Sequence, residues 1–224
     1  MVDTVTVVGA GGRAGSAISA RLRERGLALL EHDADLVLLC VPDRVIAEVA
    51  AAIPLGPWVA HVSGATPLAA LDPHVNRLSV HPLQTLVKSR GPEQLDSAWA
   101  AVTAETHGAR ELGFWLARTL GLEPFELEDG ERTIYHTGAA MASSFLVTLH
   151  AAAADLFEAA GAPPEALEPL MRRTIENGFE LTGPITRGDW ETVEAHLRAI
   201  RQRRPQLEPM YRALTETTQT LAVR

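Results

Sequence analysis

The segment that decides the fold lies near the N-terminus, where Thr4-Val-Thr-Val-Val8 runs directly into Gly9-Ala-Gly-Gly-Arg-Ala-Gly15. The first five residues are β-branched and apolar, as in a strand. Beyond the glycines, Ala14, Ile18 and Leu22 recur at helical spacing. We therefore predict a strand, a glycine turn and a helix, in this order.

The alternation of strand and helix continues through the first 130 residues. Asp35–Val41 is a nearly continuous apolar run, which is typical of a strand covered on both faces. Further strands are expected at 58–62, 77–81, 99–104 and 123–127, and helices at 43–53 and 108–120, with a short one from 66. This pattern predicts a mostly parallel, doubly wound α/β sheet.

The sequence changes character after the polar stretch Glu128-Asp-Gly-Glu131. Long helical patterns follow at 132–160, 164–181, 189–202 and 205–222, separated by glycine and proline. We expect an α/β domain over 1–130 and an all-helical domain over 131–224. The first of these helices contains Gly138-Ala-Ala-Met-Ala-Ser-Ser144, whose small residues suit either a central core helix or a helix at an interface.

The glycine turn matches the G-x-G-x-x-G/A pattern of Rossmann dinucleotide-binding domains. Gly9 permits the tight turn, Gly11 lets the backbone approach a pyrophosphate, and Ala14 lets the helix pack closely on the strand. Gly12 opens the turn further, and Arg13 could add positive charge beside a phosphate. The turn predicts an NAD(P) site; a glycine-rich turn without a ligand is the alternative.

The segment after the first helix departs from that pattern. Leu27–Glu31 could be the second strand, and Glu31 stands 20 positions after Gly11, where an acidic residue binds the ribose. However, only His32–Ala34 separates it from the next strand, whereas neighbouring parallel strands need a crossover of about a dozen residues. Either Leu27–Glu31 is not a parallel strand, or a strand and its helix are missing. Both readings predict a reduced adenosine subsite, which could weaken or abolish binding of the NAD(P) cofactor.

Three polar clusters follow predicted strands: Val41-Pro-Asp43, His61-Val-Ser-Gly64 and Val80-His-Pro-Leu-Gln84. Ligands of such sheets bind beyond the carboxyl ends of the strands. His81 could donate a proton or a hydrogen bond to a substrate carbonyl, or be structural. Ser63 could bind substrate or cofactor, or form a turn, and Asp43 is interpreted as a helix cap.

Bulk properties exclude several functions. The net charge of −8 argues against nucleic acid or an anionic membrane as partner, and no uninterrupted run of about 18 apolar residues predicts a membrane span. A secretion signal is not seen, so we expect a cytoplasmic protein. Cys40 is the one cysteine and is expected to be buried and inert. The eight histidines are scattered, so we predict no metal site.

Several segments, in this order, resemble one protein family. They are Gly9-Ala-Gly11, Leu38-Leu-Cys-Val-Pro-Asp43, His61-Val-Ser-Gly64, Ser79-Val-His-Pro-Leu-Gln84, Tyr135-His-Thr-Gly-Ala-Ala-Met-Ala-Ser-Ser144 and Leu181-Thr-Gly-Pro184. They are similar to the Rossmann-like proteins that contain DUF2520, within the superfamily of 6-phosphogluconate dehydrogenase-like and ketopantoate reductase-like oxidoreductases.

The resemblance implies an NAD(P)-binding domain, a helical domain that forms a homodimer, and an active site between the two. It places the cofactor at Gly9, Gly11 and Arg13, with Pro42 and Ser63 near the nicotinamide; His81 and Gln84 would face His136 and Ser144. The chain departs from the family between Gly26 and Asp35, which is shorter, and at Ser144, where relatives tend to have asparagine. The catalytic lysine of the wider superfamily has no counterpart after Tyr135.

Two hypotheses follow. The first is an NAD(P)-dependent oxidoreductase acting on a small carbonyl or hydroxy substrate, with His81, His136 and Ser144 as catalytic candidates and Gln84 as a substrate ligand. The second is a non-catalytic relative that binds a smaller phosphate-containing ligand or serves as a dimeric scaffold.

Overall fold

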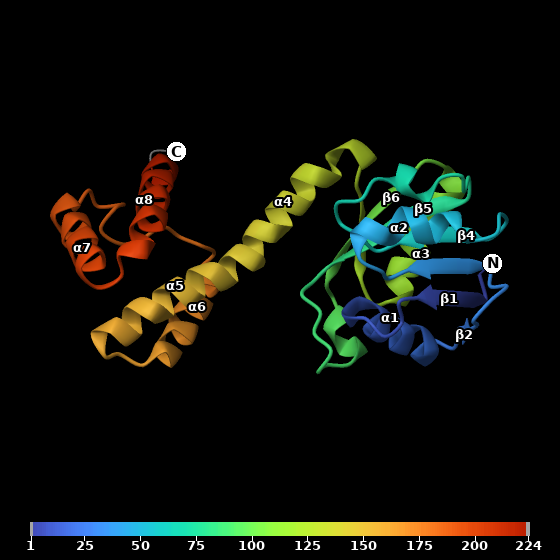
Figure 1. The fold of residues 1–224 in the computed structure, drawn as a ribbon, viewed down its shortest axis with the longest axis horizontal. Coiled ribbons are helices and arrows are strands. Elements are labelled where there is room, and N and C mark those ends of the chain that lie inside the picture. Colours follow the sequence, from blue (N-terminus) through green and yellow to red (C-terminus); the bar gives the residue numbers. More distant parts are fainter. Residues whose placement is uncertain (1, 223–224) are drawn as a thin grey trace. The chain divides into compact units, whose positions relative to one another are not determined.

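A computed structural model describes residues 2–222, and the chain forms two compact units, Met1–Met141 and Ala142–Arg224 (Figure 1). The first unit is the α/β domain and the second is helical. The expected boundary followed residue 130; helix α4 (Arg132–Ala142), which comes after it, packs on the first unit through side chains described below.

The first unit contains a seven-stranded sheet in the order β2-β1-β3-β4-β5-β6-β7. Its strands are β1 (Thr4–Val8), β2 (Ala28–Leu29), β3 (Leu36–Leu39), β4 (Trp58–His61), β5 (Arg77–Leu83), β6 (Trp99–Ala104) and β7 (Glu123–Glu126). All pairs are parallel except β5 with β6. The predicted mostly parallel Rossmann-type sheet is confirmed, with one antiparallel pair that the strand–helix alternation did not reveal.

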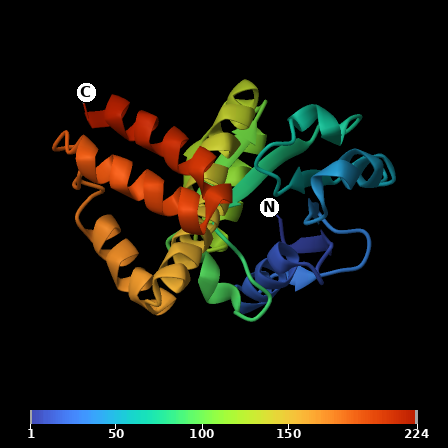
Figure 2. The same cartoon turned by 60° about the vertical axis from the view of Figure 1, so that its left-hand side comes forward.

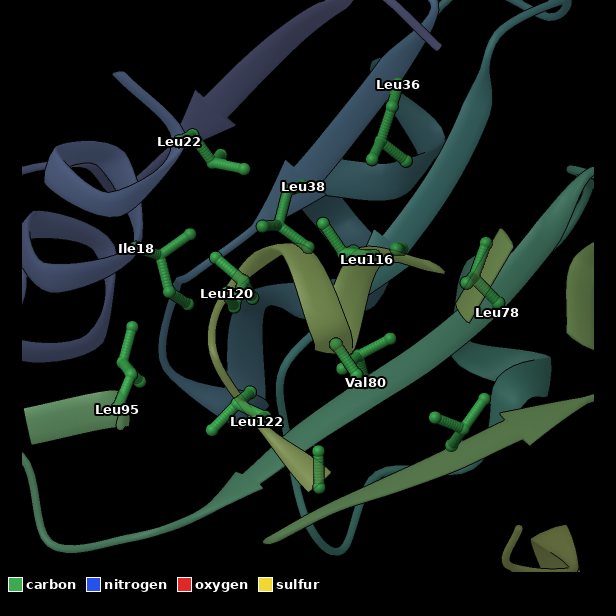
Figure 3. Close-up of a cluster of buried hydrophobic side chains, with 14 of the residues drawn as sticks. Ile18, Leu22, Leu36, Leu38, Leu78, Val80, Leu95, Leu116, Leu120 and Leu122 are labelled. Carbon is green, nitrogen blue, oxygen red and sulfur yellow. The ribbon is translucent and has the colours of Figure 1, made fainter. Parts of the chain in front are cut away.

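Helices cover both faces of this sheet, which explains the unbroken apolar run in β3. Leu36 and Leu38 pack on one face with α1 (Arg13–Glu24) and α3 (His107–Thr119), a cluster that Figure 3 shows. On the other face lie Val37 and Leu39, together with α2 (Ile46–Ala51) and a 3-10 helix at Leu68–Leu71. A strand buried on both sides has no polar face, so alternation disappears.

The second strand is present, but the helix that should follow it is not. Leu29 of β2 and Leu36 of β3 both pair with Val5, on opposite sides of β1. Because β2 stops level with the start of β3, residues 30–35 only need to pass across β1 and not back along the sheet. The alternative that Leu27–Glu31 is not a parallel strand is therefore wrong: β2 is a parallel strand of two residues, and a short loop replaces the crossover helix.

The second unit consists of α5 (Ser144–Ala160), α6 (Leu167–Glu176), α7 (Trp190–Arg203) and α8 (Glu208–Ala222) (Figure 2). The predicted helix over 132–160 is interrupted at Ser143, between α4 and α5. Asp189 caps α7 as predicted, accepting the Thr192 N–H at 3.1 Å. Arg204 pairs with Asp155 of α5, and His196 of α7 bonds Tyr211 of α8 at 2.7 Å.

One helical segment of the described chain, Asp129–Ala160, is long and apolar enough to cross a membrane, with a mean hydropathy of 1.4. The sequence lacks an uninterrupted apolar run of this length, and the segment meets the test with serine, threonine and histidine among its apolar residues. Length and composition alone are weak grounds for a membrane span, since helices in the core of soluble proteins meet the same test. None of the segment's apolar window is buried, and Phe145 and Val147 are 57% and 70% exposed.

Candidate functional site

The glycine turn joins β1 to α1 in a conformation that only glycine adopts readily at its first position. Gly9 has φ +87°, and a Cβ there would lie 2.5 Å from the carbonyl oxygen of Cys40. Helix α1 begins after Gly12, with no side-chain cap and no acidic residue in its first turn. Its first N–H groups lack intrahelical acceptors and carry the positive end of the helix dipole, which suits an anion such as a phosphate.

The later glycines of the turn have different physical roles. A Cβ on Gly11 would meet no protein atom within 4 Å, so the space beside it is open to a ligand. A Cβ on Gly15 would lie 2.1 Å from the carbonyl oxygen of Gly9. The closest approach of helix to turn is therefore at Gly15, whereas sequence analysis assigned this role to Ala14, which is only partly buried against the core.

Glu31 lies where the missing crossover helix leaves the sheet uncovered. A hollow of about 950 Å³ is lined by Glu31, His32 and Asp33 on one side and by Thr6 and Val37 of the sheet. The same hollow is lined by Val2, Asp35 and Trp58 at the amino ends of β1, β3 and β4, whereas Rossmann ligands bind beyond the carboxyl ends of the strands. The predicted role of Glu31 as a ribose ligand stays a prediction.

The loop after β4 is held in place by Ser63. Its hydroxyl oxygen accepts the N–H groups of Ala65 and Thr66, at 3.2 and 3.0 Å, and bonds the Thr66 hydroxyl at 2.9 Å. His61, the last residue of β4, is 0% exposed, and its Nδ1 accepts the Ser63 N–H at 3.2 Å. The predicted role of Ser63 as a cofactor ligand stays a prediction, since its hydroxyl already has these bonds.

A buried arginine connects this loop to the sheet. Arg132, the first residue of α4, is 1% exposed and donates to Thr103 Oγ1 at 2.8 Å, to Ser79 Oγ at 3.0 Å and to the Ser63 carbonyl. Its nearest carboxylate oxygen is that of Asp129, at 4.0 Å from Nε. The guanidinium therefore joins α4, β5, β6 and the loop after β4, and it brings a positive charge beneath the histidines described next.

Three aromatic side chains meet above that loop. His81 on β5 and Tyr135 on α4 share a hydrogen bond of 2.8 Å between Nδ1 and the hydroxyl oxygen. The ring centroids of His81 and His136 lie 6.0 Å apart. A Cβ on Gly64 would come within 2.6 Å of the His136 ring and 2.9 Å of His81 Nε2, so glycine is required for this close approach. The structure thus brings His81 and His136 together as predicted, and adds Tyr135.

Burial and positive charge keep the inner imidazoles neutral. Burial, then the Arg132 charge, lowers the pKa of His61 to about 3. Burial, with His136 and Arg132, lowers the pKa of His81 to about 4, against a weaker opposite effect of Asp43. Burial raises the pKa of Tyr135 to about 12, so the phenol keeps its proton. At neutral pH the cluster can donate and accept hydrogen bonds, but neither His61 nor His81 is a charged imidazolium.

Other predicted residues lie elsewhere or remain apart. Pro42 and Asp43 are exposed at the end of β3, and Asp43 opens a 3-10 turn without making the cap bond expected of it. Gln84 is exposed after β5, with its amide oxygen bonded to the Thr85 N–H at 2.9 Å. Ser144 is the first residue of α5, in the second unit, and its predicted catalytic role is not tested.

The remaining predictions concern Arg13, Cys40 and metals. Arg13, the first residue of α1, is exposed beside the turn. Cys40 is partly rather than fully buried, and burial raises the pKa of its thiol to about 12, in line with an inert cysteine. Within the described residues, no group of histidine, cysteine and acidic side chains could hold a metal ion.

Sequence reasoning missed the role of Arg132. An arginine at the start of an apolar helix is ordinarily a solvated residue, and no local pattern shows that the helix start is packed on the sheet. Tyr135 stood next to a predicted site residue, but its bond to His81 joins positions 54 apart in the chain. Only the tertiary fold creates such a contact.

Solved structures with similar folds span nearly all of this chain. A proposed NADP oxidoreductase of Bacteroides fragilis matches with a TM-score of 0.80 at 19% identity, covering 98% of both chains. A protein of Thermotoga maritima matches with 0.79 at 22% identity, again over 98% of both. 1-Pyrroline-5-carboxylate reductase of Streptococcus pyogenes matches with 0.61 at 14% identity, over 98% of this chain and 97% of the other. At these identities the likeness establishes the fold.

No curated protein shows a significant match. A family model does: the domain of unknown function DUF2520 matches residues 98–218, which is more than half of the chain. The match runs from β6 to α8 and includes Arg132, Tyr135 and His136. The chain therefore belongs to the DUF2520 family, as its motifs implied.

Proposed function

We propose that this protein is an NAD(P)-dependent oxidoreductase acting on a small carbonyl or hydroxy compound. The observation that carries the proposal is the open space at Gly11, in front of an uncapped helix N-terminus. Gly9 and Gly15 are explained by contacts inside the protein, whereas no protein atom near Gly11 requires glycine there, which supports a ligand that approaches the backbone. Similar folds in an NADP oxidoreductase and in a pyrroline-carboxylate reductase support the same class of reaction.

The residues present fit a dinucleotide at its pyrophosphate end. The N–H groups of the first turn of α1 would bind the phosphates, and the Arg13 side chain beside them would add charge. Pro42 and Ser63 would border the nicotinamide. When bound, the nicotinamide supplies or accepts hydride. His81 and His136 would hold the substrate oxygen, His81 as a hydrogen-bond donor, and Gln84 is proposed to contact the rest of the substrate.

The uncovered sheet beside β2 favours a second candidate. With a loop in place of the crossover helix, the adenosine would have contacts on fewer sides than in a complete Rossmann domain. Binding affinity falls when fewer groups are enclosed. The alternative function is a non-catalytic protein that binds a smaller phosphate-containing ligand at the α1 terminus or serves as a dimeric scaffold.

Titration calorimetry with NADH and NADPH separately distinguishes these candidates. Gly11→Ala is the decisive variant, because the added methyl meets no protein atom and φ is not positive, so the fold should be unchanged. We expect micromolar binding of at least one cofactor to the wild type and at least a tenfold loss in Gly11→Ala. Gly108→Ala, on α3 with ordinary contact to Trp58 at 3.8 Å, is the matched control and should bind normally.

If neither cofactor binds, the oxidoreductase proposal is wrong. Pyrophosphate binding that Gly11→Ala abolishes would then favour the smaller-ligand alternative. Equal cofactor binding by wild type and Gly11→Ala would show that the turn is not the binding site.

We also propose that the helical unit forms a homodimer. Among its described residues only Leu167, Val193, Leu197 and Ile200 are buried apolar side chains, while α5 exposes Phe145 and Val147. Exposed apolar surface of this extent is unusual on a monomer, and a second copy would cover it. Sedimentation equilibrium tests this: Val147→Glu should give a monomer if α5 lies in the interface, and a monomeric wild type would contradict the proposal.

A further inference from the structure

We propose that Tyr135 is a positioning residue that fixes His81 as a hydrogen-bond donor through Nε2. The substrate atom that meets His81 is then an acceptor, such as a carbonyl oxygen, and His81 does not act as a base. The catalytic use of this donor rests on the proposed function; the state of the imidazole does not.

The hydrogen bond between the two residues sets the tautomer. A neutral imidazole has one N–H and one bare nitrogen. The Tyr135 hydroxyl carries a proton, and among the described residues His81 Nδ1, at 2.8 Å, is its hydrogen-bond partner. A phenol is a better donor to a bare imidazole nitrogen than an acceptor from an imidazole N–H. Nδ1 is therefore the acceptor, and the imidazole proton resides on Nε2.

The surroundings hold both rings in this arrangement. Tyr135 stacks edge-on against Phe125 of β7, with ring centroids 5.9 Å apart. The Cε1–Nε2 edge of His81 lies against Gly64, where no side chain intervenes. Nε2 of His61 is a buried nitrogen without a partner, whereas Nε2 of His81 is not sealed in this way among the described residues. Under the proposal, this Nε2–H is the group that meets the ligand.

The charged and titratable groups around His81 disfavour its second proton. Burial, the neighbouring ring of His136 and the charge of Arg132 from α4 oppose a second proton, and Asp43 at the end of β3 favours one only weakly. Tyr135 itself remains a neutral phenol because burial raises its pKa to about 12. The Nε2–H form of His81 is accordingly the one present at neutral pH.

The molecule contains its own matched control. Tyr211 on α8 bonds His196 Nδ1 at 2.7 Å, with nearly the same perpendicular ring geometry, in the second unit. Tyr135 and Tyr211 are the only tyrosines in the sequence. Tyr135→Phe and Tyr211→Phe therefore remove equivalent hydroxyls, one bonded to His81 and one bonded to His196, which is not among the proposed site residues.

The test is a long-range proton–nitrogen correlation spectrum of the histidine rings at pH 8, with ¹⁵N-labelled full-length protein and no cofactor. A His81→Asn variant assigns the His81 signals. We expect wild-type His81 to carry its proton on Nε2. In Tyr135→Phe its tautomer ratio should change about fivefold, the size of one lost hydrogen bond, while His196 is unchanged. Tyr211→Phe should change the tautomer ratio of His196 and leave that of His81 unchanged.

A wild-type His81 protonated on Nδ1 would overturn the proposal, as would a tautomer ratio that Tyr135→Phe leaves unaltered. If Tyr135→Phe does not fold, the wild-type spectrum still decides which nitrogen holds the proton. The samples contain no cofactor, so the tautomer of His81 can be measured whether or not the protein binds a dinucleotide. A failure of dinucleotide binding would therefore disprove the proposed function without affecting this test.

Discussion

Mild acid is expected to destabilise the first unit through two imidazoles, those of the buried His61 and the partly buried His81. The folded state lowers the pKa of His61 to about 3 and that of His81 to about 4, chiefly by burial, whereas an ordinary histidine has a value of 6.5. The unfolded chain therefore binds protons more readily than the folded one. Their stabilising contribution is complete above pH 6.5 and is lost as the pH falls towards the folded values.

The magnitude follows from the pKa shifts. At pH 5, roughly 1.5 units below the unfolded pKa of 6.5, the unfolded histidine binds a proton that the folded one largely does not. Each unit of this difference lowers the free energy of unfolding by about 1.36 kcal/mol. Each histidine then costs about 2 kcal/mol, and the pair about 4 kcal/mol, which is a large part of the 5–15 kcal/mol typical of a folded domain. Carboxyl groups such as Asp35, whose folded pKa lies below 3.8, change stability mainly at lower pH.

Urea denaturation at pH 7 and pH 5, followed by tryptophan fluorescence, measures this effect, since Trp58, Trp99 and Trp115 lie in the first unit. The variant His61→Asn removes one titrating ring while its amide oxygen can still accept the Ser63 N–H. It should lose about half of the pH dependence of the wild type. Equal losses in wild type and variant, or a wild-type stability that is the same at both pH values, would refute the argument.

Three further predictions concern the residues that hold the glycine turn and the histidine cluster in place. Gly15→Ala should lower the free energy of unfolding by about 1–3 kcal/mol, because its Cβ would lie 2.1 Å from the Gly9 carbonyl oxygen, while Gly11→Ala should change it little; urea denaturation of both variants checks this. Arg132→Met should destabilise by about 1–3 kcal/mol, since the buried Ser63 carbonyl loses its donor. The same variant should raise the pKa of His81, measured by NMR titration, because a positive charge is removed; an unchanged pKa would show that burial alone sets it.

The sequence by itself determined the elements whose signals are local. The glycine turn, the strand run from Leu36 and the cap at Asp189 each depend on residues within a few positions of one another, and each is found where the pattern predicts it. The switch from alternating strands to long helices likewise identified the two kinds of structure. Local propensity and periodicity suffice here because the energies concerned act over one or two turns or a single strand.

The region around β2 shows where sequence reasoning stopped. A connection as short as His32–Ala34 would forbid a parallel strand only if β2 and β3 both extended along the full length of the sheet. The pairing of both Leu29 and Leu36 with Val5 removes that requirement. Register is a property of strand pairs, and no single strand encodes it.

Only the tertiary structure decided the chemistry of the site. His81, Arg132 and Tyr135 are ordinary residues in their own segments, and their effect on one another comes from burial and from contacts between β5 and α4. The low pKa values of His61 and His81 depend on solvent exclusion by elements distant in sequence. The sequence could name candidate side chains, but packing determines which protons they hold.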